Sequence, residues 1–176
     1  MKKTLFGALF LLALFCLPAS AGDIEAGLTI GYGLNMNPPT YISGVEDSNG
    51  GLIIEARAHY KLLKDFLFGG DFAVGGLTGF MMVNRYTDTS GEYGRGDIPL
   101  VGYGQLSFGP IYALAGIGFH FWTGDGKGSD LGMTYGGGYL YELDKSLALD
   151  AGLRLHTIFA NNALMLTINV GAVYRF

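Results

Sequence analysis

An alternation of apolar and polar residues with a period of two limits most strongly what this chain can fold into. In LIIEARAHYKL (52–62) the even-numbered residues are apolar, and Glu55, Arg57 and His59 stand between them. LALDAGLRLH (147–156) repeats the pattern, and no segment after residue 22 carries a helical apolar stripe. Because successive side chains of a β-strand point to opposite faces, the pattern predicts an all-β protein.

The connections between the predicted strands alternate between long and short. Long polar segments precede residues 52 and 97, whereas LKD (63–65), GP (109–110) and DKS (144–146) are tight-turn candidates. An even strand count then puts both termini at the tight-turn end, a layout typical of an eight-stranded antiparallel up-and-down transmembrane β-barrel. The predicted strands are 23–33, 52–62, 66–76, 97–108, 111–122, 131–142, 147–157 and 164–176.

A soluble up-and-down barrel or lipocalin-like carrier would show the same alternation, because the period does not say which face is outside. Two features favour a membrane. The apolar face of the clearest strands carries no charge, as lipid requires. Aromatic residues gather near strand ends, as in interfacial girdles: Tyr32, Tyr60, Phe66, Phe108, Phe121, Trp122, Tyr141, Tyr174 and Phe176.

The first 21 residues have the order of a secretory signal peptide. Lys2 and Lys3 precede an apolar run that is shorter than the roughly 20 residues of a bilayer-spanning helix, and Ala19-Ser20-Ala21 supplies a cleavage site. We therefore expect a signal peptide at 1–21 and a barrel domain at 22–176.

Cleavage would remove Cys16, the only cysteine, so disulfides and thiolate chemistry are not expected in the mature chain. Removing Lys2 and Lys3 from the 11 basic residues leaves nine against 15 acidic ones, a formal charge of −6 with histidine neutral. With no basic run to meet phosphates, nucleic acid is not an expected partner.

The chain ends in NVGAVYRF, which resembles the terminal signal of bacterial outer-membrane barrels. Asn169, Gly171, Tyr174 and Phe176 fill its polar, glycine, aromatic and final aromatic positions. The whole chain resembles the small OmpA/OmpX/OmpW-like eight-stranded barrels of Gram-negative bacteria. The resemblance implies a location in the cell outer membrane with both termini periplasmic, recognition of the last strand by the barrel-assembly machinery, and contact with outer-membrane lipid and lipopolysaccharide.

Eight strands enclose an interior that holds side chains or one small ligand. With the apolar face outside, charges of both signs turn inward and can pair with one another. Glu25, Lys61 and Arg175 are expected in one cluster, because closure brings the last strand beside the first. The predicted interior charge network consists of Glu25, Glu55, Arg57, His59, Lys61, Asp71, Asp150, Arg154, His156 and Arg175.

Catalytic and metal-binding patterns are missing from the sequence. None of the three histidines is in the His-x-Ser arrangement that outer-membrane lipid A deacylases use, and His156 has no serine on its strand face to activate. DGKGSD (125–130) lacks the alternating acidic ligands of a calcium loop. No enzyme activity, catalytic residue, cofactor or dedicated metal site is predicted. Arg95-Gly96-Asp97 matches a tripeptide of integrin ligands and leaves a host-receptor contact as a hypothesis.

These patterns predict a non-enzymatic, monomeric outer-membrane barrel without a wide pore. Its lumen is expected to be packed and polar, and its loops to serve a structural or surface-interaction role. One alternative is an OmpW-like channel for small apolar solutes, which needs an apolar cavity around Leu114, Trp122 and Met133. A lipid A-modifying enzyme is the third interpretation.

Overall fold

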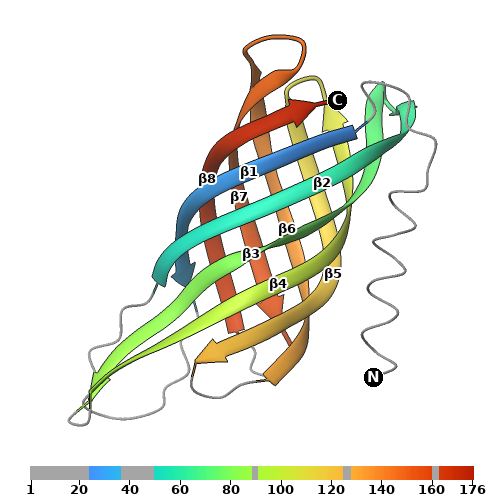
Figure 1. The fold of residues 1–176 in the computed structure, drawn as a ribbon. Coiled ribbons are helices and arrows are strands. Elements are labelled where there is room, and N and C mark those ends of the chain that lie inside the picture. The colour runs from blue at the N-terminus through green and yellow to red at the C-terminus, as the bar shows by residue number, and fades with distance from the viewer. Residues whose placement is uncertain (1–23, 37–49, 89–90, 125–127, 160–162) are drawn as a thin grey trace.

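The chain folds into a closed barrel of eight antiparallel strands, in which every strand pairs with its neighbours in the sequence and β1 pairs with β8 (Figure 1). The computed structural model describes residues 24–36, 50–88, 91–124, 128–159 and 163–176, so the predicted signal peptide lies outside the described residues. The strands are β1 (Ile24–Asn35), β2 (Gly50–Leu67), β3 (Gly70–Asp88), β4 (Gly91–Phe108), β5 (Ile111–Gly124), β6 (Gly128–Glu142), β7 (Leu147–Ile158) and β8 (Ala163–Arg175). The predicted fold class is confirmed.

The two ends of the barrel differ in their connections. The β2–β3, β4–β5 and β6–β7 turns lie together with the C-terminus, and we call this the tight-turn end. From the opposite end the β3–β4 ribbon projects well beyond the other strands (Figure 1), and we call it the long-hairpin end. Within the described residues, no helix is long and apolar enough to cross a bilayer.

The prediction of a long loop at 77–96 was wrong for most of that segment. β3 and β4 stay paired far beyond the barrel wall, with Tyr86 opposite Tyr93 and Thr87 opposite Glu92. The alternation is interrupted there by an irregularity between Met82 and Asn84, which hides the strand from a period-two search.

The first tight turn is also displaced from its predicted position at 63–65. β2 continues to Leu67, and the chain reverses at Phe68 and Gly69, both with positive φ. Two register shifts occur between Lys61 and Leu67, and residues 62–69 are all exposed. Because neither face of this tip is buried, apolar residues occupy both faces and the alternation fails.

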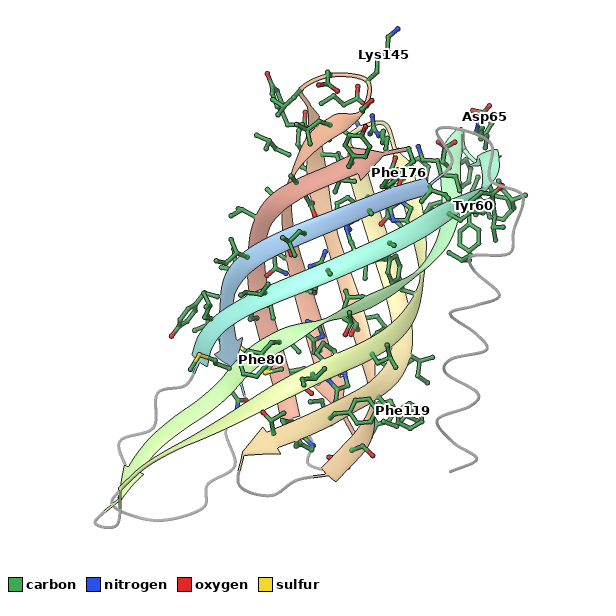
Figure 2. The ribbon with its side chains drawn as sticks, viewed as in Figure 1. Tyr60, Asp65, Phe80, Phe119, Lys145 and Phe176 are labelled. Atoms are coloured by element: carbon green, nitrogen blue, oxygen red, sulfur yellow. The ribbon has the colours of Figure 1, made fainter. Side chains whose placement is uncertain are left out.

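Large apolar side chains cover the outer face of the barrel. Leu28, Ile117 and Val170 are each more than half exposed. Aromatic residues mark both ends of this face (Figure 2), with Tyr60 and Phe176 near the tight-turn end and Phe80 and Phe119 nearer the long-hairpin end.

Trp122 does not belong to this outer girdle, although the sequence placed it there. The outer positions of β5 are the odd-numbered ones, such as Phe119 and Phe121, so Trp122 points inward and is 6% exposed.

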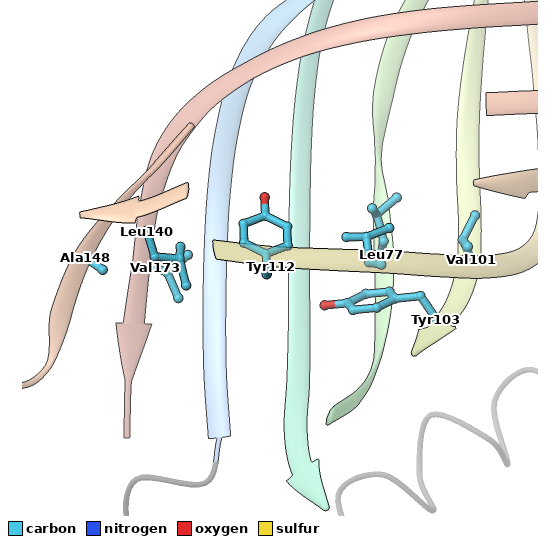
Figure 3. Close-up of a cluster of buried hydrophobic side chains, with 8 residues drawn as sticks. Leu77, Val101, Tyr103, Tyr112, Leu140, Ala148 and Val173 are labelled. Atoms are coloured by element: carbon cyan, nitrogen blue, oxygen red, sulfur yellow. The ribbon is translucent and has the colours of Figure 1, made fainter. Parts of the chain in front are cut away.

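Two apolar clusters fill part of the interior. The cluster towards the tight-turn end is drawn in Figure 3 and consists of Leu77, Val101, Tyr103, Tyr112, Leu114, Leu140, Ala148 and Val173. The cluster towards the long-hairpin end consists of Ile53, Met81, Trp122, Ile158 and Met165. We call the second cluster the apolar lid. Polar layers lie beside and between the two clusters and form the candidate site.

Candidate functional site

The predicted interior charges come from five different strands, β1, β2, β3, β7 and β8. Glu25, Glu55, Arg57, His59, Asp150, Arg154 and His156 are buried in the lumen. Lys61 and Arg175 are about one-fifth exposed and Asp71 one-third exposed, which places these three at the rim of the tight-turn end.

A middle layer of ion pairs crosses the lumen. Arg57 Nη2 lies 2.9 Å from Asp150 Oδ2, while Arg154 pairs with Glu55 and approaches Asp150 at 4.0 Å. Tyr112 donates a hydrogen bond to Asp150 at 2.8 Å, and its ring lies 4.6 Å from the Arg57 guanidinium carbon. Two cations and two carboxylates thus compensate each other in a region that solvent barely reaches.

The layer at the tight-turn end is centred on Glu25. Arg175 Nε and Lys61 Nζ each lie 3.0 Å from Glu25 Oε1, and His59 Nε2 lies 3.1 Å from its other oxygen. The second ring nitrogen of His59, Nδ1, is 3.1 Å from the Tyr103 hydroxyl. The structure therefore brings Glu25, Lys61 and Arg175 together across the β8–β1–β2 seam.

Two acidic side chains extend this cluster outward at the rim. Glu142 Oε1 accepts from Arg175 Nη1 at 2.6 Å, and Asp71 lies 4.0 Å from Lys61 Nζ. Asp71 thus has only a distant contact with the predicted network. Glu142 was not among the predicted residues. Its contact with Arg175 depends on how β6, β7 and β8 are aligned, and this alignment cannot be read from the sequence.

The layer at the long-hairpin end holds polar groups that the sequence did not connect. His120 Nδ1 lies 2.6 Å from Asp97 Oδ2, and His156 Nδ1 lies 3.0 Å from the Thr134 hydroxyl. The two imidazole centroids are 6.0 Å apart at an interplanar angle of 80°. All four side chains are completely buried. These four residues come from four different strands, β4, β5, β6 and β7. The sequence could therefore indicate only that each side chain faces inward, and not that the four meet.

The apolar lid lies next to this histidine layer. Trp122 belongs to the lid, and its indole N–H donates to Asp130 Oδ2 at 2.6 Å. Met165 stands directly opposite His156 in the β7–β8 ladder, and Met81 stands opposite Asp97 in the β3–β4 ladder. The apolar lid and the histidine layer therefore lie at the same height in the barrel, one apolar and the other polar.

The location of Asp97 overturns the integrin-ligand hypothesis. Its side chain is 0% exposed and bonded to His120 inside the lumen. A carboxylate in that position is not presented to a receptor, so the Arg95-Gly96-Asp97 match has no surface meaning.

The apolar cavity expected of an OmpW-like channel does not form around the predicted residues. Leu114 and Trp122 point inward but belong to different clusters, and Met133 lies on the outer face, where it accepts a hydrogen bond from Tyr135. A groove of about 390 Å³ does occur elsewhere. It lies over β1, β2 and β3, and its floor includes the small outward residues Ala26, Ala56 and Ala58.

The terminal residues that match the outer-membrane signal lie on both faces of β8. Asn169 is buried in the lumen, whereas Tyr174 and Phe176 are exposed on the outer face with their rings 5.0 Å apart. A Cβ at Gly171 would lie 2.6 Å from the Thr29 Cα, so the glycine permits close approach of β1 and β8. The outer pair and the glycine thus both occur at the closing seam.

Within the part of the chain that the structure describes, no group of three or more His, Cys, Asp or Glu side chains is arranged to hold a metal ion.

A closed barrel with an apolar outer face and a charged interior is the architecture of bacterial outer-membrane proteins. Residues 7–176 match the family model of the outer membrane protein beta-barrel domain, and the chain belongs to this family. The protein is therefore an outer-membrane barrel whose outer face contacts membrane lipid. No curated protein matches the chain.

Solved structures that resemble the chain are small outer-membrane barrels of low sequence identity. Neisserial surface protein A is 11% identical with a TM-score of 0.62, over 90% of this chain and 100% of that one. Ail of Yersinia pestis, solved with the heparin analogue sucrose octasulfate, is 15% identical with a TM-score of 0.53, over 88% and 99%. The N-terminal barrel domain of Pseudomonas aeruginosa OprF is 13% identical with a TM-score of 0.50, over 89% and 100%.

Proposed function

We propose that this protein is a non-enzymatic, monomeric outer-membrane barrel that is closed to solutes and meets surface partners at its long-hairpin end. The observation that carries the proposal is the middle layer, in which Arg57, Asp150, Arg154 and Glu55 pair across the lumen. Opening a path through this layer would separate buried charges from their partners, at a cost of several kcal/mol per ion.

Liposome swelling with the purified protein tests the closed lumen. The wild-type barrel should give no flux of sugars or amino acids above that of protein-free liposomes. A double variant, Arg57→Ala with Arg154→Ala, removes the two cations and much side-chain volume from the middle layer, and it should raise flux if it still folds. Flux through the wild type that depends on solute size would overturn the closed-lumen proposal and favour the channel.

The proposed orientation has the termini in the periplasm and the β3–β4 ribbon outside the cell, facing lipopolysaccharide. Among the described residues, β3 has no β2 partner after Met81, and β4 has no β5 partner before Arg95. Unpaired strand edges of this kind can accept other molecules. Ail, which shares the fold, was solved with the heparin analogue sucrose octasulfate, and this supports a search for surface ligands of this barrel.

Labelling of single cysteines in intact cells tests the orientation. A membrane-impermeant maleimide should react with Thr87→Cys in the ribbon and not with Lys145→Cys in the β6–β7 turn until the cells are lysed. The reverse pattern would invert the proposed topology. Recognition of β8 by the assembly machinery has its own test: deleting Phe176 should lower the amount of inserted barrel, measured by heat-dependent gel migration of outer-membrane fractions.

The proposed lack of catalysis is supported by the partners of the buried histidines. His120 and His156 bond to Asp97 and Thr134, respectively, and His59 bonds to Glu25 and Tyr103. None of these pairs a histidine with a serine nucleophile. Mass spectrometry of lipid A from cells with and without the protein should give identical species, and a new deacylated or acylated species would overturn the proposal.

A further inference from the structure

His120 and His156 differ from ordinary buried histidines, because in each ring one nitrogen is bonded and the other is not. Both side chains are 0% exposed. Nε2 of each ring has no hydrogen-bond partner among the described residues. A buried polar atom without a partner loses the free energy of its hydration, about 1–3 kcal/mol. Two such atoms in neighbouring rings point to a missing common ligand.

The bonded nitrogens of the two rings are held as metal-bound histidines are held. Asp97 accepts at 2.6 Å from Nδ1 of His120, so in the neutral ring the lone pair is on Nε2. Thr134 holds Nδ1 of His156 at 3.0 Å. Ligating histidines usually bond their second nitrogen to a carboxylate or another oxygen, which fixes the ring and its tautomer.

The two rings are close enough for both to reach one ion. Their centroids are 6.0 Å apart and no hydrogen bond joins them. Two imidazole nitrogens on one ion are about 3–4 Å apart, given metal–nitrogen bonds of about 2.0 Å. β6 lies between the two rings, and its Gly132 makes the approach possible, since a Cβ there would fall 2.9 Å from Nε2 of His120.

A thioether residue stands next to one member of the imidazole pair, His156. Met165 is 2% exposed and stands directly opposite His156 in the β7–β8 ladder, where Cβ atoms are about 4.5–5.5 Å apart. Imidazole and thioether together favour a soft ion, and Cu(I) above all. The Asp97 carboxylate supplies one negative charge to balance a monovalent cation in this dry layer.

We propose that His120, His156 and Met165 form a buried site for Cu(I), with Asp97 and Thr134 as positioning residues. The site goes beyond the proposed closed-barrel function and does not depend on it. Its ligand set consists of two imidazoles and one thioether.

The third histidine provides a matched control. His59 is equally buried in the same lumen, but both of its nitrogens are bonded, Nε2 to Glu25 and Nδ1 to Tyr103. A generic affinity of buried imidazoles for copper would involve His59 as well, whereas the proposed site would not.

The test is Cu(I) retention by the folded barrel. Because the site is sealed, the wild type is refolded in detergent under anaerobic conditions with ascorbate and Cu(I), and then passed over a Cu(I)-selective chelator. The wild type and His59→Gln should each retain one ion per barrel. His120→Gln and His156→Gln should retain none, and Asp97→Asn should bind about 10–100-fold more weakly. Heat-dependent gel migration verifies that each variant is folded.

Met165→Leu keeps the volume of the side chain and tests the thioether without the histidines. X-ray absorption of the loaded wild type should show nitrogen and sulfur neighbours, and Met165→Leu should lose the sulfur signal. Should a histidine variant fail to fold, this comparison still decides the matter. Retention by the wild type no greater than by the His120→Gln/His156→Gln double variant, equal loss in His59→Gln, a copper site without sulfur, or retention of Zn(II) in preference to Cu(I) would each overturn the proposal.

Discussion

The two ends of the lumen solve the problem of enclosed polar groups in different ways. At the tight-turn end, Glu25 meets three cationic or imidazole partners, and Lys61 and Arg175 remain about one-fifth exposed. At the long-hairpin end, Asp97, His120, Thr134 and His156 are completely buried beside the apolar lid, and each imidazole has one nitrogen without a hydrogen-bond partner among the described residues. The polar side chains at the first end are satisfied by other protein groups, whereas the second end leaves two ring nitrogens for the proposed ion.

The middle layer separates these two ends, and breaking it should have the largest effect. In Arg154→Met the carboxylates of Glu55 and Asp150 lose a cation in the dry interior, so unfolding should become easier by about 3–5 kcal/mol. Urea unfolding of the barrel in lipid vesicles measures this, with Trp122, the only tryptophan, as the reporter. Lys145→Met in the exposed turn is the control and should change little. An equal effect of both changes would mean that the middle layer is not a stabilising element.

The close fit of the long-hairpin end is tested by Gly132→Ala. The new methyl group would meet the His120 ring, with Cδ2 only 2.7 Å away, and displacing the ring should cost about 1–3 kcal/mol. The matched control is Gly76→Ala on β3, where a Cβ would meet nothing closer than 3.9 Å. That change should be neutral or slightly stabilising. Equal unfolding free energies for the two variants would show that the long-hairpin layer is loosely packed.

The partly exposed Glu25–Arg175 pair at the tight-turn end should contribute less than the buried middle layer. A double-mutant cycle with Glu25→Gln and Arg175→Gln should give a coupling energy of about 1 kcal/mol, because the pair is charged but partly wet and Lys61 still serves Glu25. The coupling should fall as salt is raised, since water and ions reach this rim. A coupling that is zero at low salt would contradict the observed β1–β8 register.

The sequence allowed the fold to be predicted wherever one face of a strand was clearly apolar. β2, β7 and β8 have such faces, and their inward residues Arg57, Asp150 and Arg154 were assigned to the lumen. The prediction of which residues face the lumen failed where the apolar residues change faces. At Leu62–Phe68 both faces are exposed, and in β5 the aromatic run Phe119–Trp122 conceals which member turns inward.

The partners within the interior were much harder to predict than the interior itself. Glu25 and Arg175 could be paired because closure joins the first and last strands near their known ends. Asp97 and His120 meet because of a β4–β5 register in which Asp97 stands opposite Trp122, a relation that depends on the length of a turn. His120 and His156 are two strands apart and come together over Gly132, which no single-strand pattern encodes.

The smallest expected effect belongs to the outermost contact of the tight-turn end. Glu142 bonds Arg175 at 2.6 Å, yet its side chain is 64% exposed. Water can solvate both charges when the pair is broken, so the pair contributes little to the free energy of unfolding. Glu142→Gln should lower the unfolding free energy by less than about 0.5 kcal/mol, with the difference vanishing in high salt. The denaturant guanidinium chloride is a salt and would itself screen the pair, so urea unfolding at two salt concentrations is the suitable measurement. A loss comparable to that of Arg154→Met would mean that the rim is as dry as the middle layer, and the contrast between the two ends would then depend on hydrogen bonding alone and not on access of water.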